Sequence, residues 1–216
     1  MNLRINDLDI KNKIIKSKYI YIYLVLFILA SISMVSPDNY YHPKMEIITF
    51  CLLSFLGIVF ISYYLHNNDD NKLFITAFIV ILVFGLITSM VVPIKCVSDE
   101  QEHFTRAEMT SRGILFPEFK NNSYPSISSV DTLYIKNMWK TVFETADDTA
   151  PIDQSPNAVD SVFEQNPFYG YIFSGLGILI AKLLNLNLIW MLWLGRIFNT
   201  VFYAALISLA IKIVPS

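Results

Sequence analysis

The composition of this 216-residue chain excludes an ordinary water-soluble domain. Hydrophobic residues make up 54% of it and charged residues only 16%, whereas soluble domains carry about 25% charged residues. The formal net charge of -2 gives no basic field for nucleic acid, and Lys and Arg form no nucleic-acid-binding tract. The two cysteines fit neither a disulfide framework nor a zinc motif. We therefore expect a membrane protein whose partner is the lipid bilayer and which binds no nucleic acid.

The apolar residues gather in five blocks, each near the roughly 17 to 20 residues that a helix needs to cross a bilayer. The blocks cover residues 19–35, 45–65, 73–93, 168–184 and 188–214. They predict an all-α fold, a polytopic bundle of transmembrane helices with a long, partly helical loop. The predicted parts are a basic leader at 1–18, three transmembrane helices at 19–94, the loop at 95–166 and two transmembrane helices at 167–216.

The charge pattern predicts how the chain is oriented in the cell membrane. The leader holds five basic residues against Asp7 and Asp9, so the positive-inside rule places the N-terminus in the cytoplasm. Three crossings then put the acidic loop 95–166 on the extracytoplasmic side, and Lys182 and Asn185 in a cytoplasmic turn. The chain stops directly after the fifth block, which predicts the N-terminal part of a longer, multi-pass protein.

The loop opens with Ser98-Asp99-Glu100-Gln101-Glu102-His103. Ser98 and Gln101 are spaced as a capping box and Gly113 is a suitable stop, which predicts a helix over about 99–112. Its face with Asp99, Glu102, His103 and Arg106 offers a general base, a metal ligand or a phosphate-binding group. The alternative is that the acidic residues only stabilise the first turn, by about 0.3 to 1 kcal/mol. Spacing alone favours this structural role.

Two further features have both a functional and a structural interpretation. Apolar residues recur at helical spacing over 135–143, which predicts an amphipathic helix that lies on the outer membrane surface or packs the loop on itself. Arg196 falls inside the fifth block, where an arginine is costly and indicates a functional site such as one for a lipid phosphate. Its alternative is snorkelling to the interface, next to Trp190 and Trp193.

Three short stretches resemble the GT-C type membrane glycosyltransferases. The Ser98 to His103 stretch, with Arg106-Ala107 and Gly113 after it, is similar to the Asp-Glu motif of their first large outer loop. The Asn166 to Tyr171 stretch is similar to their His-Pro-Pro-Leu-Tyr-Tyr type segment, and Gly195-Arg196 to the Gly-Arg-Leu stretch that follows. The whole chain resembles the N-terminal half of a family of large bacterial polytopic membrane proteins thought to share this fold. It departs from the pattern because its loop follows the third apolar block and Asn166 replaces the usual histidine.

The resemblance implies a function, because GT-C proteins transfer sugars from polyprenyl-phosphate donors to acceptors outside the membrane. It implies transfer to a cell-envelope glycan, with Asp99 as catalytic base or ligand of a divalent cation, Glu100 as its partner and His103 as an accessory. It also gives Arg196 a donor-phosphate role, and Arg106 is the second candidate phosphate ligand. Two other functions stay open: a transporter or flippase component for a lipid-linked intermediate, and a non-enzymatic membrane subunit whose loop binds a partner.

Overall fold

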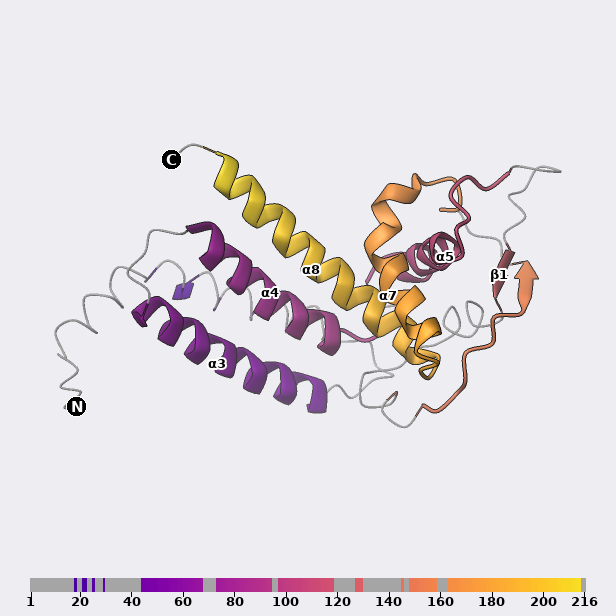
Figure 1. Ribbon diagram of the computed structural model, residues 1–216. Helices are drawn as coiled ribbons and strands as arrows, with labels where there is room; N and C mark the ends of the chain where they lie inside the picture. The colour runs from indigo at the N-terminus through magenta and orange to yellow at the C-terminus, as the bar shows by residue number, and fades with distance from the viewer. Residues whose placement is uncertain are drawn as a thin grey trace. The chain divides into compact units, whose positions relative to one another are not determined.

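The computed structural model of the protein is mostly helical (Figure 1). It describes residues 44–67, 73–94, 97–118, 127–129, 145, 148–158 and 163–214, and single positions between 18 and 29. These fall into two compact units, Met1–Thr88 with Ile207–Ser216, and Ser89–Leu206. The predicted helix over 135–143, and all but a few residues of the first apolar block, lie outside the described residues.

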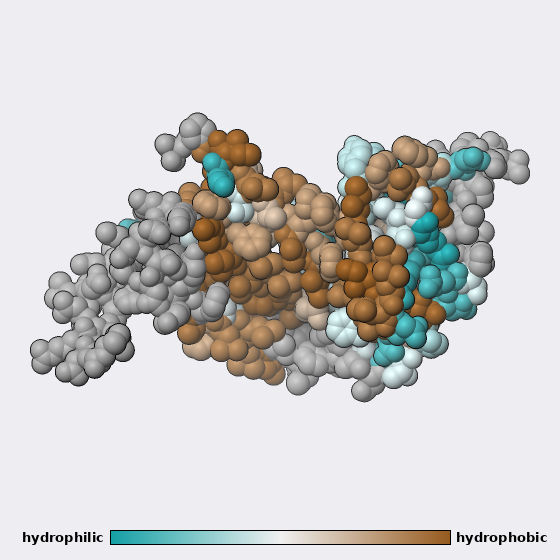
Figure 2. Space-filling view, viewed as in Figure 1, coloured by the Kyte–Doolittle hydropathy of each residue, from teal (hydrophilic) through white to brown (hydrophobic). Residues whose placement is uncertain are grey.

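The first unit is built on the helices that the second and third apolar blocks predict. Helix α3 runs over Lys44–Asn67 and helix α4 over Leu73–Val91. They pack closely at Gly57, where a β-carbon would lie 3.1 Å from Val83, and Ile61 and Phe84 are buried between them. Several of the described side chains of α3 are large, hydrophobic and exposed, among them Leu52, Phe55 and Leu56, and Figure 2 shows this part of the unit in brown. Such a surface is unfavourable in water and suits contact with lipid.

Helix α8 covers Ile189–Ile213 and contributes residues to both units. In the first unit, Ser208 Oγ near the end of α8 donates to the carbonyl of Phe74 at the start of α4, 2.6 Å away. In the second unit, Ser89 Oγ near the end of α4 lies 2.7 Å from Thr200 Oγ1 of α8. Among the described helices, α4 and α8 are the two that are long and apolar enough to cross a membrane.

The second unit packs α8 and three shorter helices around one core. Helix α5 covers Glu100–Ser111, the 3-10 helix η1 covers Phe168–Tyr171, and α7 covers Ile172–Leu183. A short ribbon pairs β1, Ile127–Ser129, with β2, Pro156–Ala158, in antiparallel register. Figure 1 shows α7 next to α5, and the core contains Phe104 and Ala107 of α5, Ile178 of α7 and Leu192 of α8.

Two glycines let α7 approach its neighbours at backbone distance. A β-carbon at Gly175 would lie 3.1 Å from the carbonyl oxygen of Ala107 in α5. One at Gly177 would lie 2.8 Å from the amide nitrogen of Gly195 in α8, and closer still to Leu194. Gly175 and Gly177 are therefore needed for the packing of α7 against α5 and α8.

The ends of α5 confirm the predicted stop and correct the predicted start. Gly113 has φ +79°, and the amides of Gly113 and Ile114 bond back to the carbonyls of Thr110 and Met109, both at 3.0 Å, which is a Schellman cap. The predicted capping box was wrong, because Asp99 and not Ser98 is the N-cap; Asp99 has φ +56°, and its side chain makes no capping hydrogen bond. Aspartate tolerates this left-handed conformation, so the helix starts one residue later than a capping box at Ser98 requires.

The fourth apolar block forms two short elements, η1 and α7. The α7 helix has 12 residues, a length of about 18 Å, against a hydrocarbon core of about 30 Å. Within residues 167–216, α8 is the described helix of spanning length. Hydropathy alone predicted two transmembrane helices in this range.

Candidate functional site

The structure brings together two of the predicted site residues, Glu100 at the start of α5 and Arg196 in α8. Arg196 Nε lies 2.5 Å from Glu100 Oε1, and Nη2 lies 2.7 Å from Oε2. Each side chain is only 11% exposed. Two parallel N–H···O bonds of this kind form a bidentate, charge-assisted pair, which is among the strongest side-chain contacts.

Arg196 also binds the end of α4. Nη1 donates to the carbonyls of Ser89 and Val92 at 2.8 and 2.7 Å, and Nη2 donates to that of Pro93 at 3.3 Å. Carbonyls at the end of a helix lack partners within it and favour a cation nearby. All three nitrogens of the guanidinium therefore have protein acceptors, and Arg196 joins α4, α5 and α8 at one point.

Asp99 occupies the junction between the end of α4 and the start of α5. Its backbone carbonyl accepts the amides of Glu102 and His103, both at 3.0 Å, and its carboxylate accepts Ser98 Oγ at 3.2 Å. The side chain is exposed. Asp99 thus presents an accessible carboxylate from a backbone that is bonded to the first turn of α5, while the carboxylate of Glu100 is held by Arg196.

His103 lies one helical turn after Asp99 and is also exposed. Its Nδ1 lies 3.0 Å from the phenol oxygen of Tyr171, which accepts a hydrogen bond from Asn166 Nδ2 at 3.0 Å. The phenol has its own hydrogen available for Nδ1, and in the tautomer that accepts it the imidazole carries its hydrogen on Nε2. The ring of Phe163 packs on the imidazole, with centroids 4.7 Å apart. This chain of contacts fixes the orientation of His103.

Arg106 does not join Asp99 and His103 as its spacing predicted, because this part of α5 is covered by residues 114–115 and 166. It is fully buried, and it donates to the carbonyls of Asn166, Ile114 and Leu115 at 2.8, 3.1 and 2.9 Å. Desolvation by burial lowers the pKa of Arg106, against the opposing effects of Tyr171 and Glu164. The described contacts link Arg106 to His103 only through Asn166 and Tyr171, and Arg106 holds the surrounding loop onto α5.

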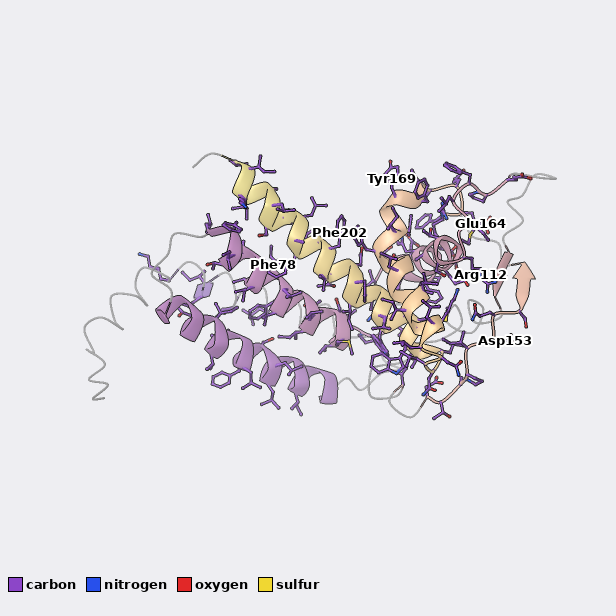
Figure 3. The ribbon with its side chains drawn as sticks, in the orientation of Figure 1. Phe78, Arg112, Asp153, Glu164, Tyr169 and Phe202 are labelled. Atoms are coloured by element: carbon purple, nitrogen blue, oxygen red, sulfur yellow. The ribbon has the colours of Figure 1, made fainter. Side chains whose placement is uncertain are left out.

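A second ion-pair cluster, which the sequence did not reveal, joins the ends of α5 and α7. Lys182 Nζ lies 2.7 Å from Glu108 Oε1 and 2.8 Å from Ser111 Oγ. The same carboxylate oxygen of Glu108 accepts from Arg112 Nε. Arg112 also donates to the carbonyl of Gln154, and Figure 3 shows Arg112 near the neighbouring Asp153. In the sequence, this cluster was indicated only by Lys182, a lysine within an apolar segment.

Sequence reasoning on single residues also missed the support of His103. Tyr171 and Asn166 were noticed only as part of a short resemblance, and Phe163 not at all. Their separation of 60 or more residues from His103 hides the contact, because no helical or strand periodicity links such distant positions.

The predicted metal ligand Asp99 has no assembled set of partners in the described part of the chain. Among those residues, no group of three or more His, Cys, Asp or Glu side chains is placed to hold a metal ion. Glu100, the nearest carboxylate in sequence, is bonded through both oxygens to Arg196. A divalent cation at Asp99 stays a prediction.

Comparison with known proteins supplies the class of the chain. Residues 78–216 match the model of a family described as predicted membrane protein, DUF2142. Comparisons with curated proteins and with solved structures gave no significant match. The matched region is more than half of the chain and contains the junction of α4, α5 and α8, and the His103 cluster. The chain therefore belongs to the DUF2142 family of predicted membrane proteins.

Proposed function

We propose that the protein acts as a GT-C-like membrane glycosyltransferase, which transfers a sugar from a polyprenyl-phosphate donor to a cell-envelope glycan. The observation that carries this proposal is the exposed carboxylate of Asp99, fixed where a helix of spanning length meets a loop helix. A polyprenyl donor keeps its phosphate at the membrane surface, whereas a glycan acceptor comes from water. A base at the end of a spanning helix is accessible to both.

Asp99 serves as the general base in this proposal. Its carboxylate takes the proton of an acceptor hydroxyl, the hydroxyl oxygen bonds to the anomeric carbon of the sugar, and the bond from that carbon to the donor phosphate breaks. The products are the extended glycan, polyprenyl phosphate and a protonated Asp99, which returns its proton to water. Both oxygens of Glu100 already accept bonds from Arg196, so Glu100 positions Asp99 and is not the base.

His103 is the group proposed to contact the departing phosphate. It lies in the first turn of α5, four residues after Asp99, and its exposed imidazole is oriented by Tyr171. An N–H directed at the phosphate stabilises the charge that develops as the sugar leaves. The guanidiniums of Arg196 and Arg106 are bonded to protein acceptors, so in this proposal they position the site and do not bind the phosphate directly.

Asp99→Asn in the chromosomal gene is expected to remove the transferred sugar from the envelope as fully as deletion of the gene. The amide cannot accept the proton, and loss of a general base lowers a rate by about 10²- to 10⁴-fold. Envelope glycan composition by mass spectrometry, with an immunoblot of the membrane fraction, gives the result. An unchanged sugar content at normal protein level would rule out the role of Asp99.

The matched control is Asp153→Asn, which removes another exposed carboxylate of the same unit. The hydroxyl and amide of Ser155 bond to Asp153 and lower the pKa of its carboxyl group. It lies on the loop near Arg112 (Figure 3) and has no place in the proposed reaction. This variant is expected to keep the envelope sugar at the wild-type level.

A further inference from the structure

We infer that α7 does not cross the membrane but lies in its interface, on the same side as α5. Its exposed apolar face contacts the lipid of that leaflet, and α8 then crosses the bilayer in the direction opposite to α4. The partner of this surface is the bilayer itself. The inference uses membership of a membrane protein family and contacts within the second unit, and it holds whether or not the protein transfers a sugar.

Both ends of α7 are fastened to the same loop helix. Tyr171, just before α7, contacts His103 of α5 at 3.0 Å, and Lys182 in its last turn contacts Glu108 of α5 at 2.7 Å. A helix that crossed the bilayer would have its ends in two water phases separated by about 30 Å of hydrocarbon. One 12-residue helix such as α5, about 18 Å long, cannot meet both ends. Therefore α7 lies alongside α5.

The turn after α7 is bonded to the loop as well. The amide of Leu188 donates to the carbonyl of Ala150 at 2.8 Å, and Asn187 Nδ2 donates to the carbonyl of Asp148 at 3.3 Å. Pro151 and Asn187 form an isolated β-bridge. Lys182, which the sequence predicts in a cytoplasmic turn, and the residues just after that turn thus contact the loop that the sequence predicts outside. The two segments share one side of the membrane.

One side of η1 and α7 carries exposed large hydrophobic side chains. Tyr169, Leu176 and Leu183 follow one another at seven-residue steps and are 69%, 42% and 74% exposed. Gly175 and Ile178, on the packed side, are buried. Figure 2 shows hydrophobic residues on the visible side of the second unit beside hydrophilic ones. A helix with one apolar and one anchored side is typical of segments that lie in the membrane interface.

The apolar side of α7 adjoins α8, a helix long and apolar enough to cross the membrane. Lipid is therefore the partner that we expect for this side of α7. Phe173, between Tyr169 and Leu176 on the helix, stacks on Phe202 of α8 with ring centroids 3.5 Å apart. Val201 and Tyr203, on either side of Phe202, are exposed large hydrophobic residues. Lipid around α8 therefore reaches α7. In the same arrangement, Lys212 at the end of α8 returns to the side of the basic leader, as the positive-inside rule favours.

Cysteine labelling of the full-length protein tests the crossing. In a Cys51→Ser, Cys96→Ser background, single cysteines replace Asn187 after α7, Gln154 in the loop, Asn68 after α3 and Val214 after α8. A membrane-impermeant maleimide is added to intact and to permeabilised cells. Asn187→Cys and Gln154→Cys are expected to be labelled under the same condition, and Val214→Cys and Asn68→Cys under the other. If Asn187→Cys is instead labelled under the same condition as Asn68→Cys, α7 crosses the bilayer and the inference is wrong.

Spin labels test the lipid contact separately. Leu176→Cys, Leu183→Cys and the Gln154→Cys control carry a nitroxide in protein reconstituted into phosphatidylethanolamine–phosphatidylglycerol vesicles. Oxygen, which concentrates in lipid, is expected to collide more with the labels at 176 and 183, and a water-soluble nickel chelate more with the label at 154. If 176 and 183 resemble 154, the apolar face meets water or another protein and its assignment to lipid is wrong.

Discussion

Replacing Arg196 by methionine is expected to lower the free energy of unfolding by about 3 to 5 kcal/mol, the usual cost of removing one partner of a buried ion pair. The variant leaves the Glu100 carboxylate, only 11% exposed, without its bidentate partner. It also removes the donor to the carbonyls of Ser89, Val92 and Pro93 at the end of α4. Equilibrium unfolding in mixed detergent micelles measures the difference.

Two further variants separate the ion pair from general damage at Arg196. Adding Glu100→Gln to Arg196→Met removes the charge that has lost its bidentate partner, so the double variant should be more stable than the single one. Arg112→Met is the matched control, because Glu108 keeps its contact with Lys182 when Arg112 is lost. If Arg196→Met were no less stable than Arg112→Met, the proposed junction of α4, α5 and α8 would contribute little to the fold.

Gly177→Ala is expected to be the most damaging single methyl addition in the second unit. The new β-carbon would meet backbone atoms of Leu194 and Gly195, which cannot rotate away as a side chain can, so α7 and α8 must separate. Overpacking of this kind costs about 1 to 3 kcal/mol. The same unfolding experiment gives the value, and the spin-label contrast at Leu176 should weaken as α7 shifts.

Gly170→Ala provides the control for Gly177→Ala. No described atom lies within 4 Å of a β-carbon at Gly170, so this substitution should leave the stability within about 0.5 kcal/mol of wild type, as at other surface positions. Equal stability of the two alanine variants would contradict the close crossing of α7 and α8.

The sequence was sufficient to predict the described helices where one strong local signal decided them. Apolar blocks predicted α3, α4 and α8, and Gly113 predicted the end of α5. The same signal does not distinguish the 12-residue α7 from a spanning helix, because hydropathy measures preference for lipid and does not say whether a helix crosses the bilayer or lies along it. The packing of Gly175 and Gly177 against α5 and α8 comes from residues far away in the chain.

The candidate site was predictable in its residues more than in its contacts. Asp99, Glu100, His103 and Arg196 were selected from composition and resemblance, but the pairing of Glu100 with Arg196 joins positions 96 residues apart. The spacing of Arg106 predicted the side of the helix on which it lies, but it did not predict that residues 114–115 and 166 cover that side. The sequence predicts a cytoplasmic turn at Lys182, because its partner Glu108 lies 74 residues earlier and leaves no local signal of the contact.

The role of Asp99 is tested most directly with the purified full-length protein in vesicles, supplied with synthetic polyprenyl-phosphate sugars and with envelope glycan from a strain lacking the gene. Release of polyprenyl phosphate is measured together with the gain of sugar on the glycan. We expect both with the wild-type protein and with Asp153→Asn, and neither with Asp99→Asn. Undiminished release by Asp99→Asn, or no release by the wild-type protein from any donor, would contradict the proposed glycosyltransferase.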